Sequence, residues 1–162
     1  MAKNKNIKSS LFDYFSNFDQ SLNHSHAYKP SLKKNLKYLK LPKKRFEFRG
    51  QIDERSLYDD YAHHPNEIKE TIKLGRLFIN QKTNNQFQKN RLIALFQPHR
   101  YSRVKQFNKE FAEELSKADV IYVTSIYGAG EENEDKITSR IITDQIYKKN
   151  KNVSYINNYY EV

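Results

Sequence analysis

The sequence contains no cysteine and only four glycines among its 162 residues. Without cysteine the chain has no disulfide framework, no thiolate metal site and no cysteine nucleophile. None of the four glycines stands before a Lys-Ser or Lys-Thr pair, so these residues include no Gly-rich loop of the kind that cradles phosphates. The sequence also lacks any run of the ~20 apolar residues that a membrane-spanning helix needs.

The first 30 residues are rich in Lys, Asn and Ser and contain no apolar run of 7 or more residues. A secretory signal peptide requires an apolar run of about that length. Together with the absence of cysteine, this composition predicts a cytoplasmic protein that does not enter a membrane.

Aromatic residues make up 14% of the sequence, with 12 tyrosines and 10 phenylalanines. Disordered chains are poor in aromatic residues. A chain of this length can bury roughly two-thirds of its unfolded surface. The composition therefore predicts one folded domain with an appendage.

The net charge of +10 is distributed unevenly along the chain. Residues 1–50 contain 12 Lys and Arg against 3 acidic residues, whereas residues 51–162 contain 17 against 16. A strongly basic chain suggests nucleic acid as a partner, but here the excess belongs to the leading segment. We interpret residues 1–30 as a poorly ordered basic leader and expect no nucleic-acid partner. A basic nucleic-acid-binding module remains the alternative function.

Strand and helix patterns alternate from residue 45 onwards. Strand patterns lie at residues 46–50, where Gly50 closes the strand, at Leu57-Tyr58, and at residues 92–96, 120–123 and 153–156. The unbroken apolar run at 92–96 predicts a strand buried on both faces. We expect it to lie beside 120–123 at the centre of the sheet. The alternation predicts an α/β domain with a Rossmann-like, mostly parallel sheet flanked by helices.

Helix patterns occur in four segments. The first covers residues 31–41 and ends before Pro42. The second begins at Pro65, with Glu67 in its first turn, and a surface loop at residues 80–90 follows it. The third carries a stripe of Phe107, Phe111 and Leu115, and the fourth begins at Ile137.

Polar clusters follow three of the predicted strands, and ligands of open α/β sheets bind beyond the carboxyl ends of strands. The clusters are Asp59-Asp60-Tyr61-Ala62-His63-His64-Pro65, Gln97-Pro98-His99-Arg100-Tyr101-Ser102-Arg103 and Ile126-Tyr127-Gly128-Ala129-Gly130-Glu131. Arginine is suited to carboxylates because its planar fork bonds both oxygens.

Each cluster also has a structural interpretation. The His63-His64 pair could cap a helix or, less readily, bind a metal ion. Arg100 and Arg103 could be a solvated helix start, although positive charge there is unfavourable. The Gly128-Ala129-Gly130 segment lacks the third glycine of a dinucleotide fingerprint and could be only a turn.

In order and spacing, these clusters and the Lys44-Arg45-Phe46-Glu47 string resemble the carboxyl-terminal domain of the Mur ligase family. The resemblance covers residues 31–162. The string Phe96-Gln97-Pro98-His99-Arg100-Tyr101-Ser102-Arg103 is similar to the alanine-adding branch, the UDP-N-acetylmuramate–L-alanine ligases, and not to branches that add other amino acids or the murein tripeptide. Asn66 replaces the threonine that is commoner after the proline.

The resemblance implies a ligase that uses ATP to join L-alanine to UDP-N-acetylmuramate in peptidoglycan synthesis. Residues 31–44 correspond to the end of the central domain, and residues 45–162 to a carboxyl-terminal domain that is incomplete at its end. ATP and Mg²⁺ are expected to bind mainly to domains that this sequence lacks. The chain is therefore expected to be inactive alone and to work with a companion chain; a non-catalytic partner of a larger ligase is a further alternative.

The resemblance also assigns roles to individual residues. Arg45, Asp60 and His63 correspond to nucleotide contacts, with Asp60 on the ATP ribose. Tyr61, Arg100 and Arg103 correspond to substrate contacts, with the two arginines on the alanine carboxylate. It implies no catalytic side chain and no metal ligand here, and it assigns no contact to His64 or His99.

Overall fold

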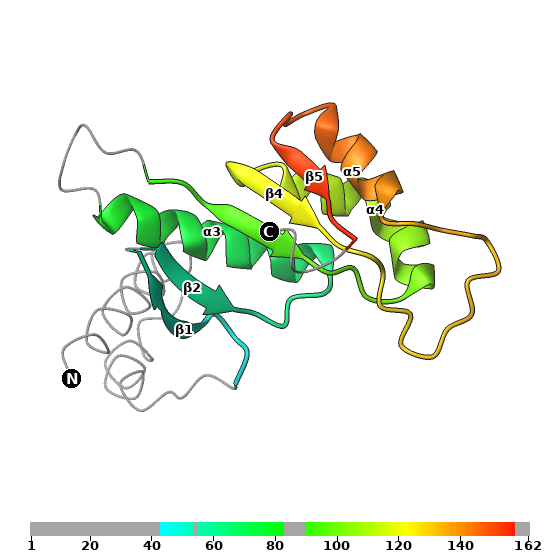
Figure 1. Ribbon diagram of the computed structural model, residues 1–162, viewed down its shortest axis with the longest axis horizontal. Helices are drawn as coiled ribbons and strands as arrows, with labels where there is room; N and C mark the ends of the chain where they lie inside the picture. Colours follow the sequence, from blue (N-terminus) through cyan, green and yellow to red (C-terminus); the bar gives the residue numbers. More distant parts are fainter. Residues whose placement is uncertain (1–42, 54, 83–89, 158–162) are drawn as a thin grey trace, which may run out of the picture. The chain divides into compact units, whose positions relative to one another are not determined.

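The computed structural model describes residues 43–53, 55–82 and 90–157 (Figure 1). The chain divides into two compact units, Met1–Arg45 and Phe46–Val162, and the second contains all the helices and strands described below. The predicted basic leader and the predicted helix at 31–41 lie outside the described residues. Within the described part, no helix is long and apolar enough to cross a membrane.

An antiparallel hairpin opens the second unit. It consists of β1 (Glu47–Ile52) and β2 (Arg55–Asp59). The rings of Phe46 and Tyr58 stack at 4.5 Å between centroids, and Phe78 lies 5.3 Å from the first and 5.6 Å from the second. Because an isolated two-stranded hairpin is marginally stable, this aromatic cluster holds it against the following helix. The prediction that Gly50 ends the strand was wrong: the register shifts between Phe48 and Gly50 and pairing continues.

Helix α3 (Pro65–Lys82) begins at the predicted proline. The carboxylate oxygen Oε2 of Glu67 accepts hydrogen bonds from the backbone N–H groups of His63, at 3.0 Å, and His64, at 3.1 Å. This is the reciprocal half of a capping box, in which a glutamate in the first turn satisfies N–H groups at the helix start. The helix continues to Lys82, beyond the residue 80 at which a loop was predicted.

Three parallel strands form the second sheet, in the order β3 (Ile93–Phe96), β4 (Val120–Val123) and β5 (Val153–Tyr155). Ile93 pairs with Val120, and Phe96 with Val123. The α/β class with its parallel sheet is therefore confirmed, and so is the adjacency of β3 and β4. Only β4 is central, however; β3 ends the order of the described strands.

Helices α4 (Tyr101–Leu115) and α5 (Arg140–Tyr147) connect these strands. The prediction that α5 begins at Ile137 was wrong. The side-chain amide of Asn133 bonds both backbone groups of Ile137, accepting from its N–H at 2.7 Å and donating to its carbonyl at 2.9 Å. These two bonds hold residues 133–137 as a closed loop, and the helix starts three residues later.

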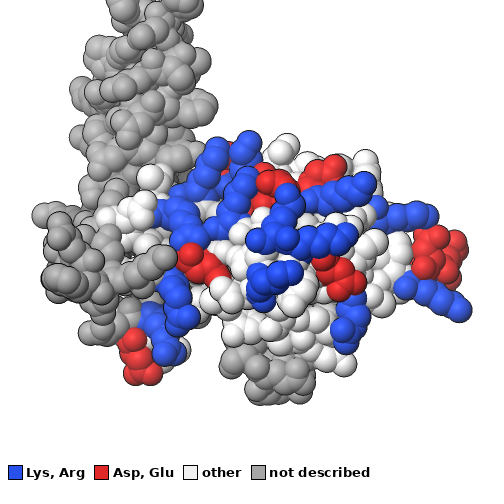
Figure 2. All heavy atoms as spheres, turned by 90° about the horizontal axis from the view of Figure 1, so that it is seen from above, with Lys and Arg blue, Asp and Glu red and all other residues white. Residues whose placement is uncertain are grey.

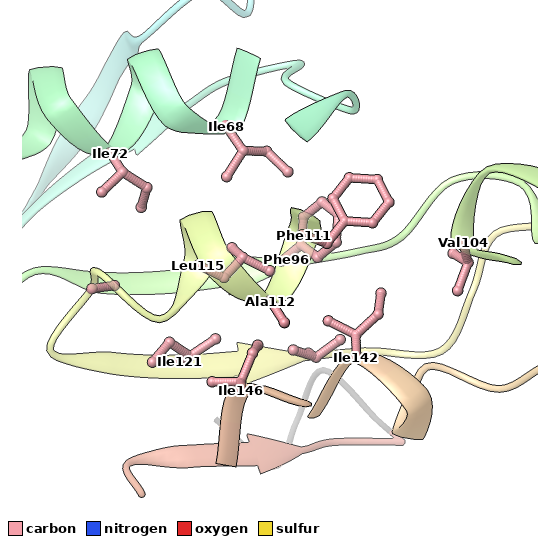
Figure 3. Packing of buried hydrophobic residues seen from close by; sticks show 12 residues of the cluster. Ile68, Ile72, Phe96, Val104, Phe111, Ala112, Leu115, Ile121, Ile142 and Ile146 are labelled. Carbon is pink, nitrogen blue, oxygen red and sulfur yellow. The ribbon is translucent and has the colours of Figure 1, made fainter. Parts of the chain in front are cut away.

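The hydrophobic core lies between one face of the parallel sheet and the three helices (Figure 3). Figure 3 shows Leu115 and Ala112 of α4 between the isoleucines of α3 and those of α5 and β4. The buried members of the cluster are Ile68, Ile72, Phe96, Val104, Phe111, Ala112, Leu115, Ala118, Ile121, Val123, Ile142 and Ile146. Helix α4 therefore occupies the middle of the packed layer.

The other face of the sheet is more open than predicted. Ile93 and Leu95 are 50% and 54% exposed, whereas Phe96 is 7% exposed. Side chains alternate between faces along a strand, and the core packs only against the face that carries Phe96. The prediction of a strand buried on both faces was therefore wrong for β3.

A bidentate ion pair ties α3 to the turn before β4. The Arg76 guanidinium donates to both carboxylate oxygens of Asp119, at 2.5 and 2.9 Å, and to the carbonyl of Lys117 at 2.6 Å. Asp119 also accepts from the backbone N–H of Leu92 at 2.7 Å. One carboxylate thus fixes the start of β3, the start of β4 and the middle of α3.

Replacing Phe111 with alanine should lower the free energy of unfolding by roughly 3–5 kcal/mol, because Phe111 is fully buried and the substitution leaves a cavity. Urea denaturation followed by far-UV circular dichroism measures the change. Leu95→Ala is the control: this residue is 54% exposed, so its loss should cost clearly less. Equal losses for the two variants would contradict the placement of α4 in the core.

Candidate functional site

The three predicted polar clusters occupy the loops after β2, β3 and β4 (Figure 1). Two of these loops, at residues 97–100 and 124–139, leave the same edge of the parallel sheet. The third leaves β2, which belongs to the separate hairpin. The prediction that all three follow strands of one open sheet was therefore wrong, although ring contacts still connect the three loops.

Backbone hydrogen bonds join the loops after β3 and β4. The N–H of Tyr127 donates to the carbonyl of Pro98, and the N–H of Arg100 donates to the carbonyl of Tyr127, both at 2.8 Å. His99 and Tyr127 form an isolated parallel bridge. The sheet pairing therefore extends past the strand ends to the first residue before α4.

Four rings lie in a row across the three loops. Tyr61 contacts His63 at 5.1 Å between centroids, His63 lies 6.1 Å from His99, and His99 lies 5.4 Å from Tyr127. The two tyrosines at the ends of the row are 51% and 57% exposed. The row thus presents aromatic surface to solvent beside the arginines of the second loop.

Arg100 and Arg103 have different surroundings. The Arg100 side chain is about half exposed, and its Nη1 lies 3.7 Å from Oε1 of Glu131. Arg103 is less exposed, and its Nη1 lies 3.4 Å from both Nδ1 and the carbonyl oxygen of His99. Arg100 lies just before α4 and Arg103 lies in its first turn. Both guanidinium groups keep N–H donors that these long contacts engage only weakly.

The pKa of His99 lies below its ordinary value, first because of desolvation on burial and then because of the nearby charges of Arg103, Arg100 and His63. Glu131 acts in the opposite direction. His99 therefore favours its neutral form, in which one ring nitrogen can accept a hydrogen bond. The positive character of this edge comes from the arginines.

Asp60 uses its carboxylate to order its own loop. Oδ2 accepts from the N–H of Phe46 at 2.8 Å, and Oδ1 accepts from the N–H of Ala62 at 2.7 Å. The side chain is partly buried. A carboxylate can accept about four hydrogen bonds in all, so each oxygen retains capacity for one hydroxyl donor.

Glu131 is a site residue for which the sequence suggested no role. Its Oε2 accepts from the backbone N–H of Ser102 at 3.0 Å, and its Oε1 accepts from the Ser102 hydroxyl at 2.7 Å. These bonds hold down the pKa of the Glu131 carboxyl, with the backbone bond as the largest cause and the Arg100 charge as a smaller one. The sequence signal was the acidic residue after the Gly-Ala-Gly segment, but its partner lies 29 residues away.

The Gly128-Ala129-Gly130 segment is a turn, closed by a bond of 3.0 Å from the N–H of Glu131 to the carbonyl of Gly128. A Cβ on Gly128 would lie 2.7 Å from the ring carbon Cε2 of Tyr101, so a larger residue would force the ring to move. Gly130 has φ of +86°, which glycine adopts without strain. The interpretation of this segment as a turn is thus confirmed.

An open cavity of about 590 Å³ lies beside the site. It is lined by the first turns of α4 and by residues 131–135 with Ile137. Its lining includes Glu131 and Ser102 but neither Arg100 nor Arg103. The cavity is thus a neighbour of the arginine pair, with Glu131 between the two regions.

Basic side chains spread over the face shown in Figure 2, with acidic side chains among them. Several of the basic residues of this unit are paired, including Lys149 with Glu113 at 2.5 Å and Lys117 with Glu114 at 2.6 Å. The unit therefore presents mixed charge on this face.

The structure thus brings Tyr61, His63, Arg100 and Arg103 into one connected region through the ring row and the joined loops. Arg45 is the last residue of the other compact unit, so no geometry relates it to this region. His64 lies at the start of α3, where its ring contacts Phe107 at 5.0 Å. Among residues 43–53, 55–82 and 90–157, no group of three or more His, Asp or Glu side chains is arranged to hold a metal ion.

The imidazole of His99 should titrate below the ordinary histidine pKa, because burial and the adjacent arginines disfavour its charged form. NMR titration of its ring protons measures the midpoint. Arg103→Gln should raise that midpoint, since it removes the arginine whose charge lowers the pKa of His99 more. The depressed pKa means that the folded state loses stability as pH falls below the unfolded-state value. A midpoint unchanged in Arg103→Gln would contradict the described geometry.

Comparison with known families and curated proteins gives a consistent result. Residues 44–162 match the family model described as Mur ligase, glutamate ligase domain. The chain is 64% identical over 132 residues to a UDP-N-acetylmuramate–L-alanine ligase of Prochlorococcus marinus subsp. pastoris, covering 81% of this chain and 28% of that protein. It is 43% identical over 113 residues to the ligase of the same name from Microcystis aeruginosa, covering 70% and 23%. The chain thus spans about a quarter of the length of these relatives.

Solved structures are similar in fold. A UDP-N-acetylmuramate–alanine ligase from Thermotoga maritima has a TM-score of 0.55 at 22% identity, covering 92% of this chain and 27% of that one. A murein peptide ligase from Psychrobacter arcticus has a TM-score of 0.52 at 21% identity, covering 78% and 24%. At these identities the likeness concerns the fold alone.

Proposed function

The chain belongs to the Mur ligase family, and we propose that it supplies the carboxyl-terminal domain of an ATP-dependent ligase that joins L-alanine to UDP-N-acetylmuramate in peptidoglycan synthesis. The observation that carries the proposal is the 64% identity over 132 residues to a ligase named for that reaction. The paired arginines at the start of α4 support it, because they belong to the segment that resembles the alanine-adding branch.

The proposed role of Arg100 and Arg103 is to hold the carboxylate of L-alanine. Arg100 immediately precedes α4 and Arg103 lies in its first turn, and the Arg100 side chain is about half exposed. A guanidinium binds a carboxylate through two parallel N–H donors. The site acids Asp60, Glu67 and Glu131 already accept backbone N–H groups. Glu131 also lies 3.7 Å from Nη1 of Arg100, a distance that leaves the guanidinium with N–H donors for an anionic ligand.

The proposed nucleotide contacts involve Arg45, Asp60 and His63. Asp60 holds two backbone N–H groups and still has acceptor capacity, which fits a ribose hydroxyl as an additional donor. Tyr61 offers exposed aromatic surface beside it, and the half-buried ring of His63 contacts Tyr61. We propose that Mg²⁺ and the ATP phosphates bind mainly to other domains of the ligase.

In the proposed reaction, ATP phosphorylates the lactyl carboxylate of UDP-N-acetylmuramate, and the amine of L-alanine attacks the acyl phosphate to give an amide and phosphate. The contribution of this chain is to bind and orient the alanine. Orientation of two reactants can supply a large part of a rate enhancement. These 162 residues contain no Gly-rich phosphate loop, so we propose that other parts of the ligase bind the ATP phosphates and that these residues are inactive alone.

The purified 162-residue chain should release no phosphate above background when given ATP, Mg²⁺, UDP-N-acetylmuramate and L-alanine. A malachite green assay measures phosphate, with an intact ligase of the same family as the positive control. Alanine-dependent release by the chain alone would contradict the assignment of the phosphate site to other domains. Capture of a larger Mur ligase that is already active without this chain would favour a regulatory partner instead.

Arg100→Ala should leave the unfolding midpoint of the chain nearly unchanged, because the side chain is about half exposed and its main partner is 3.7 Å away. It should weaken L-alanine binding at least tenfold, because it removes a guanidinium proposed to hold the alanine carboxylate. Ligand-observed NMR measures the affinity, and thermal denaturation measures stability. Arg91→Ala is the matched control, since it removes an exposed arginine that lies two residues before β3. An Arg100→Ala chain that binds L-alanine normally, or that fails to fold, would contradict the proposed role.

A further inference from the structure

Helix α4 begins in an unusual way. Arg100 occupies the position before the first helical residue with φ of 72° and ψ of 131°, and its side chain makes no capping hydrogen bond. The first turn contains no acidic residue. A positive φ is strained for a residue other than glycine, and a positive side chain at a helix amino end is unfavourable. The position of Arg100 must therefore be held by groups outside the helix.

The capping group comes from the loop after β4. Glu131 accepts from the N–H of Ser102 through Oε2 and from the hydroxyl of Ser102 through Oε1. Its carboxylate thus satisfies a free N–H of the first turn and places negative charge at the positive end of the helix. The depressed pKa of Glu131 agrees with an ionised carboxylate in this position.

The backbone around Glu131 is fixed relative to Arg100. The carbonyl of Tyr127 accepts from the N–H of Arg100 at 2.8 Å, and four residues later the N–H of Glu131 closes the turn onto Gly128. Gly128 allows the loop to approach Tyr101, the residue next to Arg100. Glu131 and Arg100 are therefore held together by the backbone as well as by their charges.

We propose that Glu131 is a positioning residue that orients the Arg100 guanidinium for the carboxylate of L-alanine. This inference rests on the proposed function. Ser102 engages both oxygens of Glu131, and Arg100 lies at 3.7 Å from Oε1, longer than an ordinary charged hydrogen bond. Glu131 therefore attracts the guanidinium without occupying its two-pronged donor face. That face stays available to a second carboxylate.

Ser102 is the second half of this arrangement. Its hydroxyl donates to Oε1, the same oxygen that lies nearest to Arg100. Without the hydroxyl, Oε1 would be available to bond Arg100 directly and would compete with the ligand. A capping role alone predicts lower stability in variants of Glu131 or Ser102 but no change in the affinity of the folded chain for L-alanine.

The test measures L-alanine affinity by ligand-observed NMR on the full 162-residue chain. Glu131→Gln should raise the dissociation constant at least tenfold, because it removes the charge that orients Arg100. Glu134→Gln is the matched control: it removes an equal charge from the same loop, and the affinity should stay within twofold. Unchanged affinity in Glu131→Gln would overturn the proposal.

Two variants of Ser102 test the same proposal even if Glu131→Gln fails to fold. Ser102→Ala should weaken L-alanine binding severalfold by freeing Oε1, and Ser102→Thr should restore it by returning a hydroxyl. Equal affinity in these two variants would overturn the proposal.

A spectroscopic measurement separates this inference from the proposed function. In ¹H–¹⁵N spectra, the Nε–H resonance of Arg100 and the amide resonance of Ser102 should both shift in Glu131→Gln and remain in place in Glu134→Gln. If the unsubstituted chain does not bind L-alanine, the assigned ligand of the arginines is wrong. In that case, a shift of the Arg100 resonance in Glu131→Gln supports the orientation of Arg100 by Glu131. An unshifted resonance in that variant overturns this orientation.

Discussion

Parallel pairing between β3 and β4 does not stop where the two strands end. It continues through the hydrogen bonds that Tyr127 exchanges with Pro98 and Arg100, so the loops that follow the strands are held to each other by backbone groups. Every feature of the arginine region depends on that continuation: the start of α4, the contact of His99 with Tyr127, and the position of Glu131. A backbone ladder gives such an arrangement a rigidity that surface side chains alone do not provide.

Carboxylates play one recurring part in this domain. Asp60, Glu67, Asp119 and Glu131 each accept a backbone N–H from a loop or a helix start. Buried or half-buried N–H groups are costly when unsatisfied, and a charged acceptor strengthens the bond. The acids are thus directed towards the chain itself while Arg100 remains half exposed. An edge built in this way favours an anionic ligand, which agrees with the proposed alanine carboxylate.

Local pattern was sufficient for most of the fold. The runs at 92–96 and 120–123, the stripe of Phe107, Phe111 and Leu115, and the proline start of α3 all correspond to described elements. The errors arose where burial or long-range contacts decided the outcome. Ile93 and Leu95 are apolar yet exposed, because the helices pack on the opposite face of the sheet. Ile137 fits a helical stripe, but the side chain of Asn133 holds it in a loop.

For the candidate site, too, local pattern predicted some features and long-range contacts decided others. Residue types and their order along the chain were enough to indicate the family, because such motifs are continuous in sequence. They also led to the prediction of Asp60, Tyr61, His63, Arg100 and Arg103 as site residues. Only tertiary structure could show that β2 lies outside the parallel sheet, that four rings from three loops form a row, and that Glu131 caps a helix 29 residues away. Contacts of this kind depend on which loops the strand pairing brings together, and no local pattern records that pairing.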